Sequence, residues 1–170
     1  MEKIILLCGK SGCGKSTISE ILQTKGLKVI QSFTTRPKRT PNEQGHIFIS
    51  KEDFDCLHDY VAYTKFNGYE YCATERQVEN NDIYIVDPKG IEYFVKHYNG
   101  FKKPVVIQIK TNTFRLIRNM RKRQDSWKSI ISRLLNDAKM FKNIDKLSDA
   151  IILNNFSIND CAEKLYRIIK

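Results

Sequence analysis

A glycine-rich stretch near the amino terminus, Gly9-Lys10-Ser11-Gly12-Cys13-Gly14-Lys15-Ser16, constrains this chain more than any other segment. It matches the full G-x-x-x-x-G-K-[ST] pattern of a phosphate-binding loop. The short apolar run at residues 4–8 predicts a buried parallel strand before the loop, and an amphipathic helix is predicted from Thr17 onward. A strand, this loop and a helix in direct succession are the context that the motif requires. The sequence therefore predicts a binding site for a nucleoside triphosphate.

Each part of this loop suits the chemistry of a triphosphate. Glycines let the loop wrap tightly, so that backbone N–H groups point inward, and the helix amino terminus adds partial positive charge. We expect Lys15 to reach the β- and γ-phosphates of ATP and the Ser16 hydroxyl to ligate Mg²⁺. The predicted ATP-binding residues of this segment are Gly9, Ser11, Gly12, Cys13, Gly14, Lys15, Ser16 and Thr17.

Composition narrows the class of protein. A length of 170 residues with 41% hydrophobic residues suits one globular domain, and no apolar run approaches the length that spans a membrane. Five cysteines without a C-x-x-C pair favour reduced thiols, and the first residues lead directly into a strand, so we expect a cytoplasmic protein. The net charge of +10 fits either a nucleic-acid binder or an enzyme that binds two phosphorylated small molecules. The phosphate loop favours the second interpretation.

The rest of the chain alternates strands and helices. Strands are predicted at residues 27–30, 46–49, 82–87, 103–109 and 150–153, and Asn67-Gly68 predicts a hairpin turn. Helices are predicted after Ser50, at 74–80, from Pro88 to 97, from 113, at 127–142 and at 157–169. This alternation predicts an α/β fold with a parallel sheet and helices on both of its faces.

A second anion site is predicted in the segment 31–41, which reads as a loop because it contains two prolines and several hydroxyl side chains. Its cations, Arg36, Lys38 and Arg39, together with its threonines, offer the donors that a phosphate needs. Asp87 ends a predicted parallel strand, where a carboxylate points into the ligand crevice.

In order and spacing, these motifs resemble those of guanylate kinases. They are the phosphate loop, Thr34-Thr35-Arg36-Pro37-Lys38-Arg39, Phe66-Asn67-Gly68, Ile85-Val86-Asp87-Pro88-Lys89-Gly90, Arg133-Leu134 and Ile152-Leu153-Asn154. The resemblance covers nearly the whole chain. It implies a P-loop NTPase-type fold in a single domain, 1–170. Its core would comprise residues 1–31, 83–114 and 143–170, with an inserted nucleoside-monophosphate-binding region at 32–82 and a helical lid at 115–142.

The resemblance also implies an activity and residue roles. The activity is Mg²⁺- and ATP-dependent phosphorylation of a nucleoside monophosphate, most simply ATP + GMP = ADP + GDP. Ser32, Arg36, Arg39 and Tyr71 resemble the ligands of the acceptor phosphate, Asp87 the carboxylate near the acceptor base, and Asn154 the residue near the donor adenine. Besides Lys15, the implied catalytic residues are the lid cations Arg118, Lys122 and Arg133.

Several positions depart from the family pattern. Phe48 stands where the family has a phosphate-binding Tyr. Ala62 stands where a Glu pairs with the guanine edge, and Ala73 replaces a Ser or Thr that contacts the base, although Thr74 is adjacent and could contact the acceptor instead. Because unpaired polar groups are what reject the wrong base, we expect guanine selectivity to be reduced or changed.

Two further departures concern charge. Ile85 replaces the first Asp of the family's D-x-D, and Lys122 stands at a lid position that is usually Arg, whose bidentate grip on phosphate Lys cannot reproduce. Three alternative functions stay open at this point. They are a sugar-phosphate kinase similar to ribose bisphosphate phosphokinase, a non-catalytic guanylate-kinase-like binding module, and a kinase acting on nucleic-acid ends.

Overall fold

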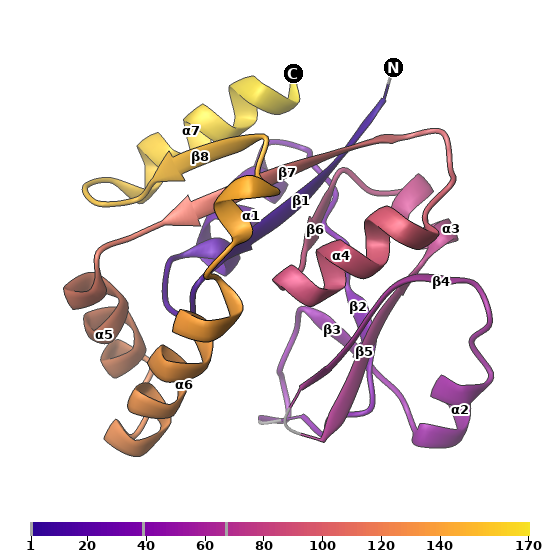
Figure 1. Cartoon of the computed structure of the whole chain (residues 1–170), viewed down its shortest axis with the longest axis horizontal. Helices are drawn as coiled ribbons and strands as arrows, with labels where there is room; N and C mark the ends of the chain where they lie inside the picture. Colours follow the sequence, from indigo (N-terminus) through magenta and orange to yellow (C-terminus); the bar gives the residue numbers. More distant parts are fainter. Residues whose placement is uncertain (1, 39, 67) are drawn as a thin grey trace.

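The structure, a computed structural model, describes residues 2–38, 40–66 and 68–170, which form two four-stranded sheets (Figure 1). The larger sheet has the strand order β6-β1-β7-β8, and each neighbouring pair is parallel. Its strands are β1 (Lys3–Gly9), β6 (Ile83–Ile85), β7 (Lys103–Lys110) and β8 (Ala150–Leu153). This arrangement confirms the predicted parallel α/β sheet and puts the phosphate loop at the carboxyl end of a central strand.

Helices cover both faces of the larger sheet. The α1 helix (Lys15–Thr24) and the α7 helix (Ile158–Ile169) pack together over one face, and α4 (Pro88–His97) lies over the other. Strand β1 is buried on both sides, so that Ile5 and Leu7 join one core cluster and Ile4 and Leu6 join the other. An uninterrupted apolar run is therefore the pattern that a central parallel strand requires.

The smaller sheet is formed within the segment 32–74. Its strand order is β3 (His46–Phe48), β2 (Ser32–Thr34), β5 (Tyr69–Thr74) and β4 (Tyr60–Phe66). The hairpin of β4 and β5 confirms the predicted turn; Gly68 has φ of +83°, and Asn67 lies outside the described residues. Tyr63 packs against Tyr93 of α4 at a ring-centroid distance of 6.0 Å, so this aromatic joins the hairpin to the helix.

Two predictions about the segment after α1 are wrong. Residues 27–30 form no extended strand. Val29 makes an isolated bridge to Ile83, and the adjacent backbone hydrogen bonds reach only residues 82 and 83. The predicted loop at 31–41 instead contains β2, whose three residues pair with β3 on one side, while Phe33 and Thr34 also pair with β5 on the other. Ser32 and Thr34 are buried although they are polar. Tertiary pairing, which the local sequence does not record, decides both cases.

The remaining helices are α2 (Lys51–Asp55), α3 (Glu75–Glu79), α5 (Thr113–Lys122), α6 (Trp127–Met140) and the 3₁₀ turn η1 (Ile144–Lys146). The helices predicted after Ser50 and from 113 are capped by the residues before them: Ser50 Oγ accepts from Asp53 N at 3.0 Å and Asn112 Oδ1 accepts from Arg115 N at 2.9 Å. Among the described residues, no helix combines the length and apolar character that crossing a bilayer demands.

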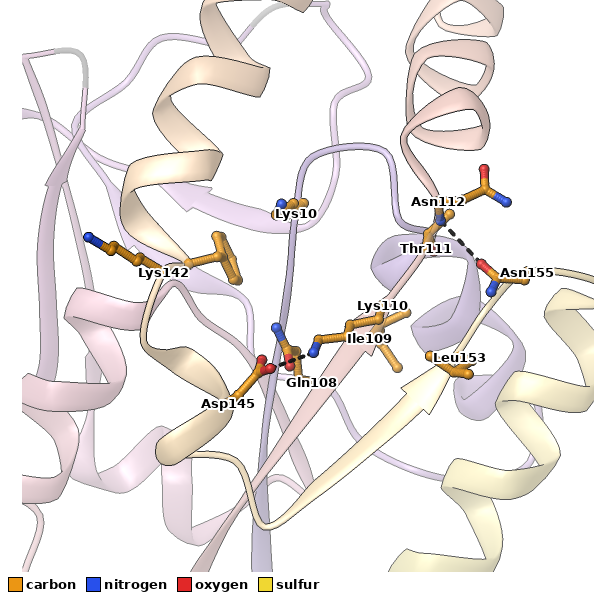
Figure 2. Close-up of a pocket in the computed structure, with 11 residues that line it drawn as sticks. Lys10, Gln108, Ile109, Lys110, Thr111, Asn112, Lys142, Asp145, Leu153 and Asn155 are labelled. Atoms are coloured by element: carbon orange, nitrogen blue, oxygen red, sulfur yellow. Dashed lines mark hydrogen bonds and ion pairs between the residues drawn. The ribbon is translucent and has the colours of Figure 1, made fainter.

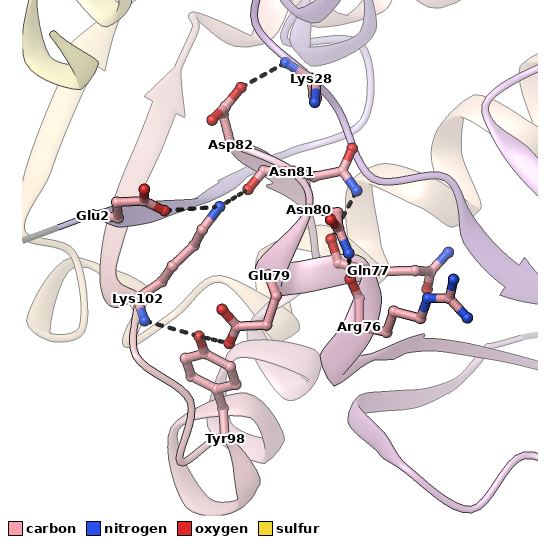
Figure 3. A network of polar contacts seen from close by, with 10 residues as sticks. All are labelled: Glu2, Lys28, Arg76, Gln77, Glu79, Asn80, Asn81, Asp82, Tyr98 and Lys102. Carbon is pink, nitrogen blue, oxygen red and sulfur yellow. Dashed lines mark hydrogen bonds and ion pairs between the residues drawn. The ribbon is translucent and has the colours of Figure 1, made fainter.

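A polar network joins the amino-terminal ends of the strands, at the edge opposite the phosphate loop (Figure 3). Lys102 is 6% exposed, and its Nζ donates to Asn81 O at 2.7 Å and lies 3.8 Å from Glu2 Oε2. Tyr98 Oη donates to Glu79 Oε1 at 2.6 Å and accepts from Lys102 N. Burial raises the pKa of Tyr98, so the phenol remains a neutral donor. This network joins the segments that precede β1, β6 and β7 to α3, at the end of the sheet that is far from the phosphate loop.

Replacing Phe94 by Ala tests the core beneath α4. Phe94 is fully buried, so Phe94→Ala removes a large side chain from a packed cluster and should lower the free energy of unfolding by about 3–5 kcal/mol. Val95 is the next residue of the same helix and is 62% exposed. Val95→Ala should change stability by no more than about 0.5 kcal/mol. Urea unfolding followed by circular dichroism measures both, and similar losses would contradict the assigned core.

Candidate active site

The phosphate loop adopts a tightly wrapped conformation, and neighbouring elements pack closely against it. Gly12 and Gly14 have φ of +80° and +102°, in the left-handed region that favours glycine. A Cβ on Gly14 would lie 2.7 Å from Asn154 Nδ2, and one on Gly12 would lie 2.8 Å from Leu116 O. Glycine is therefore required at both positions by the backbone conformation and by the lack of space.

Side chains from three other segments bind the loop backbone. Asn154 Nδ2 donates to Cys13 O at 2.8 Å, and Asn119 Nδ2 donates to Gly12 O at 2.8 Å. Asp137 Oδ2 accepts from Ser11 N at 2.6 Å. The sequence reasoning did not single out Asn119 or Asp137, because a polar residue on a predicted helix gives no sign of a partner more than 100 residues away.

Asn154 lies beside the loop rather than in an open base site. Its side chain is 1% exposed, and its amide nitrogen is engaged by the loop carbonyl. Its Oδ1 is buried without a hydrogen-bond partner among the described residues. The predicted contact with adenine would therefore have to use this oxygen.

Lys15 folds back over the loop. Its Nζ donates to Gly9 O at 2.6 Å and lies 3.3 Å from Lys10 O. A phosphate would exchange these neutral carbonyl acceptors for anionic oxygens, which make stronger hydrogen bonds. Ser16 and Thr17 follow at the exposed start of α1. A free hydroxyl at the mouth of the loop fits a Mg²⁺ ion that keeps most of its ligands as water and phosphate oxygens.

A cleft of about 380 Å³ joins the start of α1 to the smaller sheet. Ser16 lines it on the side of the phosphate loop, and Ser32, Arg36 and Tyr71 line it on the opposite side. The structure therefore brings together three of the four predicted ligands of the acceptor phosphate. The fourth, Arg39, lies outside the described residues.

The guanidinium of Arg36 is held in place by a carboxylate that the sequence reasoning missed. Its Nη2 and Nη1 donate to the two carboxylate oxygens of Glu43 at 2.8 and 3.1 Å, and Nη1 also donates to Pro37 O. Hydrogen bonding to Glu43 raises the pKa of Arg36, which stays charged. Arg36 Nε is buried without a partner among the described residues. Glu43 thus holds the two terminal nitrogens of the guanidinium, while Nε is a donor without an acceptor among the described residues.

A smaller cavity of about 160 Å³ shares Ser32, His46, Tyr71 and Ile85 with this cleft. Asp87 lines it as predicted, with Oδ1 accepting from Gly90 N at 2.7 Å and Oδ2 accepting from Thr64 Oγ1 at 3.0 Å. Tyr84 is buried at its wall, and desolvation raises the pKa of its phenol. The wall is therefore aromatic, with one carboxylate fixed by two donors.

The two alanines that replace base-reading residues face each other across the hairpin. Ala62 of β4 pairs with Ala73 of β5, both have no exposed surface, and both belong to the apolar core cluster of Tyr84. Thr74 lies outside both cavities; its Oγ1 accepts from Gln77 N and caps α3. The structure therefore does not bring Thr74 to the site, because the helix cap uses its hydroxyl.

The predicted lid cations lie on α5 and α6, away from the cleft. Arg118 and Lys122 are exposed on α5, and Arg133 is half-buried on α6, where its Nε donates to Ser129 Oγ at 3.3 Å. None of the three lines the 380 Å³ cleft. Figure 1 shows α5 and α6 on one side of the molecule and the smaller sheet on the other. The structure does not bring these cations together with Arg36.

A third cavity, of about 340 Å³, opens at the carboxyl ends of β7 and β8 (Figure 2). Lys10 of the phosphate loop lines it, together with Lys110 and Asp145, whose charged groups lie 2.5 Å apart. The Lys110 ammonium lowers the pKa of Asp145. Gln108, 3% exposed, lines the same cavity and has an unpaired Oε1 among the described residues. Polar side chains thus surround the loop on the side opposite the cleft.

Comparison with known proteins places this geometry in a family. The family model described as guanylate kinase matches residues 1–170. The chain is 26% identical over 163 residues to a guanylate kinase of Bartonella quintana, covering 89% of this chain and 73% of that protein. It is 28% identical over 165 residues to a guanylate kinase of Helicobacter hepaticus, covering 89% and 82%.

Similarity extends to solved structures. The crystal structure of guanylate kinase from Anaplasma phagocytophilum superposes with a TM-score of 0.68 at 18% identity. The match covers 99% of this chain and 84% of that one. At this identity the likeness concerns the fold, and it agrees with the parallel sheet and flanking helices described above.

The loop geometry predicts different consequences for two glycine substitutions. Gly14→Ala would add both left-handed strain and a 2.7 Å contact with the buried Asn154, whereas Gly26→Ala, at φ of +86°, meets no atom within 4 Å. Gly26→Ala should lower the free energy of unfolding by about 1–2 kcal/mol from strain alone. Gly14→Ala should lower it further. Chemical unfolding of both variants measures the difference, and equal losses would show that the loop does not press on Asn154.

Proposed function

Because the chain belongs to the guanylate kinase family, whose members are nucleoside monophosphate kinases, we propose that it transfers the γ-phosphoryl group of ATP to a nucleoside monophosphate, with GMP and dGMP as the first candidates. One observation carries this proposal. The cleft has Ser16 of the phosphate loop on one side and Ser32, Arg36 and Tyr71 on the other. A donor and an acceptor phosphate bound on these two sides would meet within one cavity.

On the donor side, the phosphate loop and Lys15 would bind the β- and γ-phosphates, and Ser16 would hold Mg²⁺. Bound Mg²⁺ supplies charge neutralisation at the phosphate oxygens. Lys15 would leave Gly9 O and Lys10 O for the phosphate oxygens, so that its charge lies on the transferred group. The donor nucleoside would extend toward the carboxyl ends of β7 and β8, where the 340 Å³ cavity opens beside Lys10 of the loop (Figure 2).

On the acceptor side, Ser32, Arg36, Arg39 and Tyr71 would bind the monophosphate. Arg36 contributes a charge that Glu43 holds in place, and the buried Nε of Arg36 still needs an acceptor. An acceptor phosphate oxygen is already anionic and requires no general base. It attacks the γ-phosphorus as the bond to the bridging β–γ oxygen breaks, and that oxygen leaves on ADP.

The segments 32–82 and 115–142 would act as the acceptor-binding region and the lid. Arg118, Lys122 and Arg133 do not line the cleft, so a role on a phosphate bound there would require α5 and α6 to close over it. Closure would exclude water and bring positive charge to the transferring group, where it stabilises the transition state.

We further infer that guanine selectivity is reduced. Guanine recognition requires a carboxylate acceptor opposite its N–H edge, and Ala62 and Ala73, which are fully buried, offer no such group. The same feature favours a second candidate, a sugar-phosphate kinase similar to ribose bisphosphate phosphokinase, because such an acceptor has no base to read. The intact phosphate loop argues against a non-catalytic binding module.

Replacing Lys15 tests the donor side. Lys15→Ala should lower kcat by at least about two orders of magnitude, because it removes a charge that stabilises the transferring group. Lys164→Ala, which removes an exposed lysine of α7, should leave kcat unchanged. Coupled measurement of ADP release with GMP as the acceptor gives both values. Near-native turnover of Lys15→Ala would remove Lys15 from the mechanism.

A panel of acceptors tests the base selectivity. With ATP as the donor, kcat/KM for GMP, AMP, CMP and UMP should differ far less than the 10⁴-fold or more expected of a site built to pair with one base. Ala62→Glu should raise the preference for GMP over AMP by at least about tenfold and should lower thermal stability, since the new carboxylate is unpaired without guanine. Ala62→Gln controls for added size. Strict preference of the wild type for GMP would refute reduced selectivity, and ribose 1,5-bisphosphate as the best acceptor would favour the second candidate.

A further inference from the structure

The position of the missing tyrosine hydroxyl has a neighbour that can replace it. Phe48 lies on β3, and its ring faces the cations of Arg36 at 5.2 Å and Lys38 at 5.5 Å. Phe48 therefore provides a surface on which these side chains pack, and it has no group that binds phosphate. His46 lies two residues earlier on the same strand, so both side chains are on the same face of β3.

The imidazole of His46 is in direct contact with two predicted phosphate ligands. His46 pairs with Ser32 in the β2–β3 register, and its Nδ1 lies 2.9 Å from Ser32 Oγ. Its ring meets that of Tyr71 edge-on at 5.6 Å. His46 lines both the 380 Å³ cleft and the smaller cavity beside Asp87. It therefore lies where the phosphate end and the nucleoside end of an acceptor would meet.

We propose that His46 binds the acceptor phosphate, in the role that the absent tyrosine hydroxyl would otherwise have. This inference deepens the proposed function and rests on it. When the ring is protonated, Nδ1–H donates to Ser32 Oγ, and the Ser32 hydroxyl is then free to donate its own proton to a phosphate oxygen. The imidazolium adds a positive charge beside the anion, and hydrogen bonds supported by charge are about twice as strong as neutral ones.

Other charged groups near His46 set the sign of its pH dependence. The other titratable or charged side chains that line the same two cavities come from α1, the segment after β2, β5, β6 and the start of α4. They are Glu20, Arg36, Glu43, Tyr71, Tyr84 and Asp87. Lys38 lies over Phe48 on the same strand face. A bound phosphate dianion adds negative charge at the centre of this group and favours the imidazolium. Binding that depends on His46 must therefore weaken as pH rises through the titration of the ring.

A tyrosine hydroxyl would not have this pH dependence, because it stays neutral up to a pH of about 10. With Phe at position 48 in place of the family's Tyr, and with His46 binding the phosphate instead, acceptor affinity would be sensitive to pH in the physiological range. The phosphate itself gains its second charge near pH 6, so the comparison must be between variants at the same pH.

Kinetics of His46→Gln provide the first test. Glutamine can keep a hydrogen bond to Ser32 but cannot carry charge. At pH 6, KM for the nucleoside monophosphate should rise about tenfold relative to the wild type, with KM for ATP unchanged, and at pH 8.5 the ratio should fall to about twofold. His58→Gln, at an exposed turn, should match the wild type at both pH values. The double variant His46→Gln/Phe48→Tyr should recover acceptor affinity without regaining the pH dependence.

A ratio of KM values that is the same at pH 6 and pH 8.5 would overturn the proposal, since it would reduce His46 to a structural support for Ser32. So would an unchanged KM for His46→Gln.

Nuclear magnetic resonance gives a readout that does not depend on catalysis. The chain has three histidines, so the imidazole signals of His46 can be assigned by their loss in His46→Gln. Addition of GMP to the wild type should raise the midpoint of the His46 titration by about one pH unit, which corresponds to about tenfold tighter binding by the imidazolium form. The signals of His58 and His97 should not move.

An unchanged His46 midpoint at saturating GMP would refute the inference alone. Absence of turnover with every acceptor, together with a shifted midpoint, would refute the proposed reaction and leave the phosphate contact standing.

Discussion

The phosphate loop keeps its shape because side chains from distant segments bind its backbone. Asn154, Asn119 and Asp137 come from the loop after β8, from α5 and from α6, and each bonds to a different residue of the loop. A backbone with left-handed glycines has a large conformational entropy when it is unfolded or unsupported. These bonds fix it before any ligand arrives, so its amides need not be ordered during binding. They also connect the loop to both helices of the proposed lid.

Because the site depends on contacts between distant segments, only some of its parts could be predicted from the sequence. The loop, the two flanking elements and the helix caps follow local rules of spacing and residue type, and the structure confirms them. Glu43 as the partner of Arg36 and Asp137 as the partner of Ser11 could not be predicted, because they depend on how separate segments pack. The short strand at 32–34 was missed for the same reason. Its polar residues carry no periodic pattern, and it forms because β3 and β5 lie on either side of it.

The pairing of Arg36 with Glu43 bears on how strongly the acceptor binds. Arg36 is 8% exposed, and an isolated guanidinium with so little contact with water would be strongly destabilising. Glu43 neutralises it and fixes the plane of its fork through two oxygens. The same carboxylate lowers the net positive charge that an acceptor phosphate meets. Other donors around the cleft must therefore supply part of the attraction, and among the described residues Ser32, His46 and Tyr71 line the cleft with Arg36.

Ala62 and Ala73 occupy two paired, buried positions of the hairpin where the resemblance to guanylate kinases implies residues that contact the base. A carboxylate at position 62 would be stable only with a partner, and a hydroxyl opposite it at 73 is the nearest candidate, because the two positions pair across the hairpin. Replacing one alone would leave the other polar group buried without a partner, which is destabilising. With Ala at both positions, the pair needs no polar partner and packs in the same buried apolar cluster as Tyr84. No polar group at these two positions would be left unpaired by the wrong base, which is the basis of the reduced guanine selectivity that we propose. Selection among acceptors must then come from the phosphate end of the cleft, where nearly all the predicted ligands are retained.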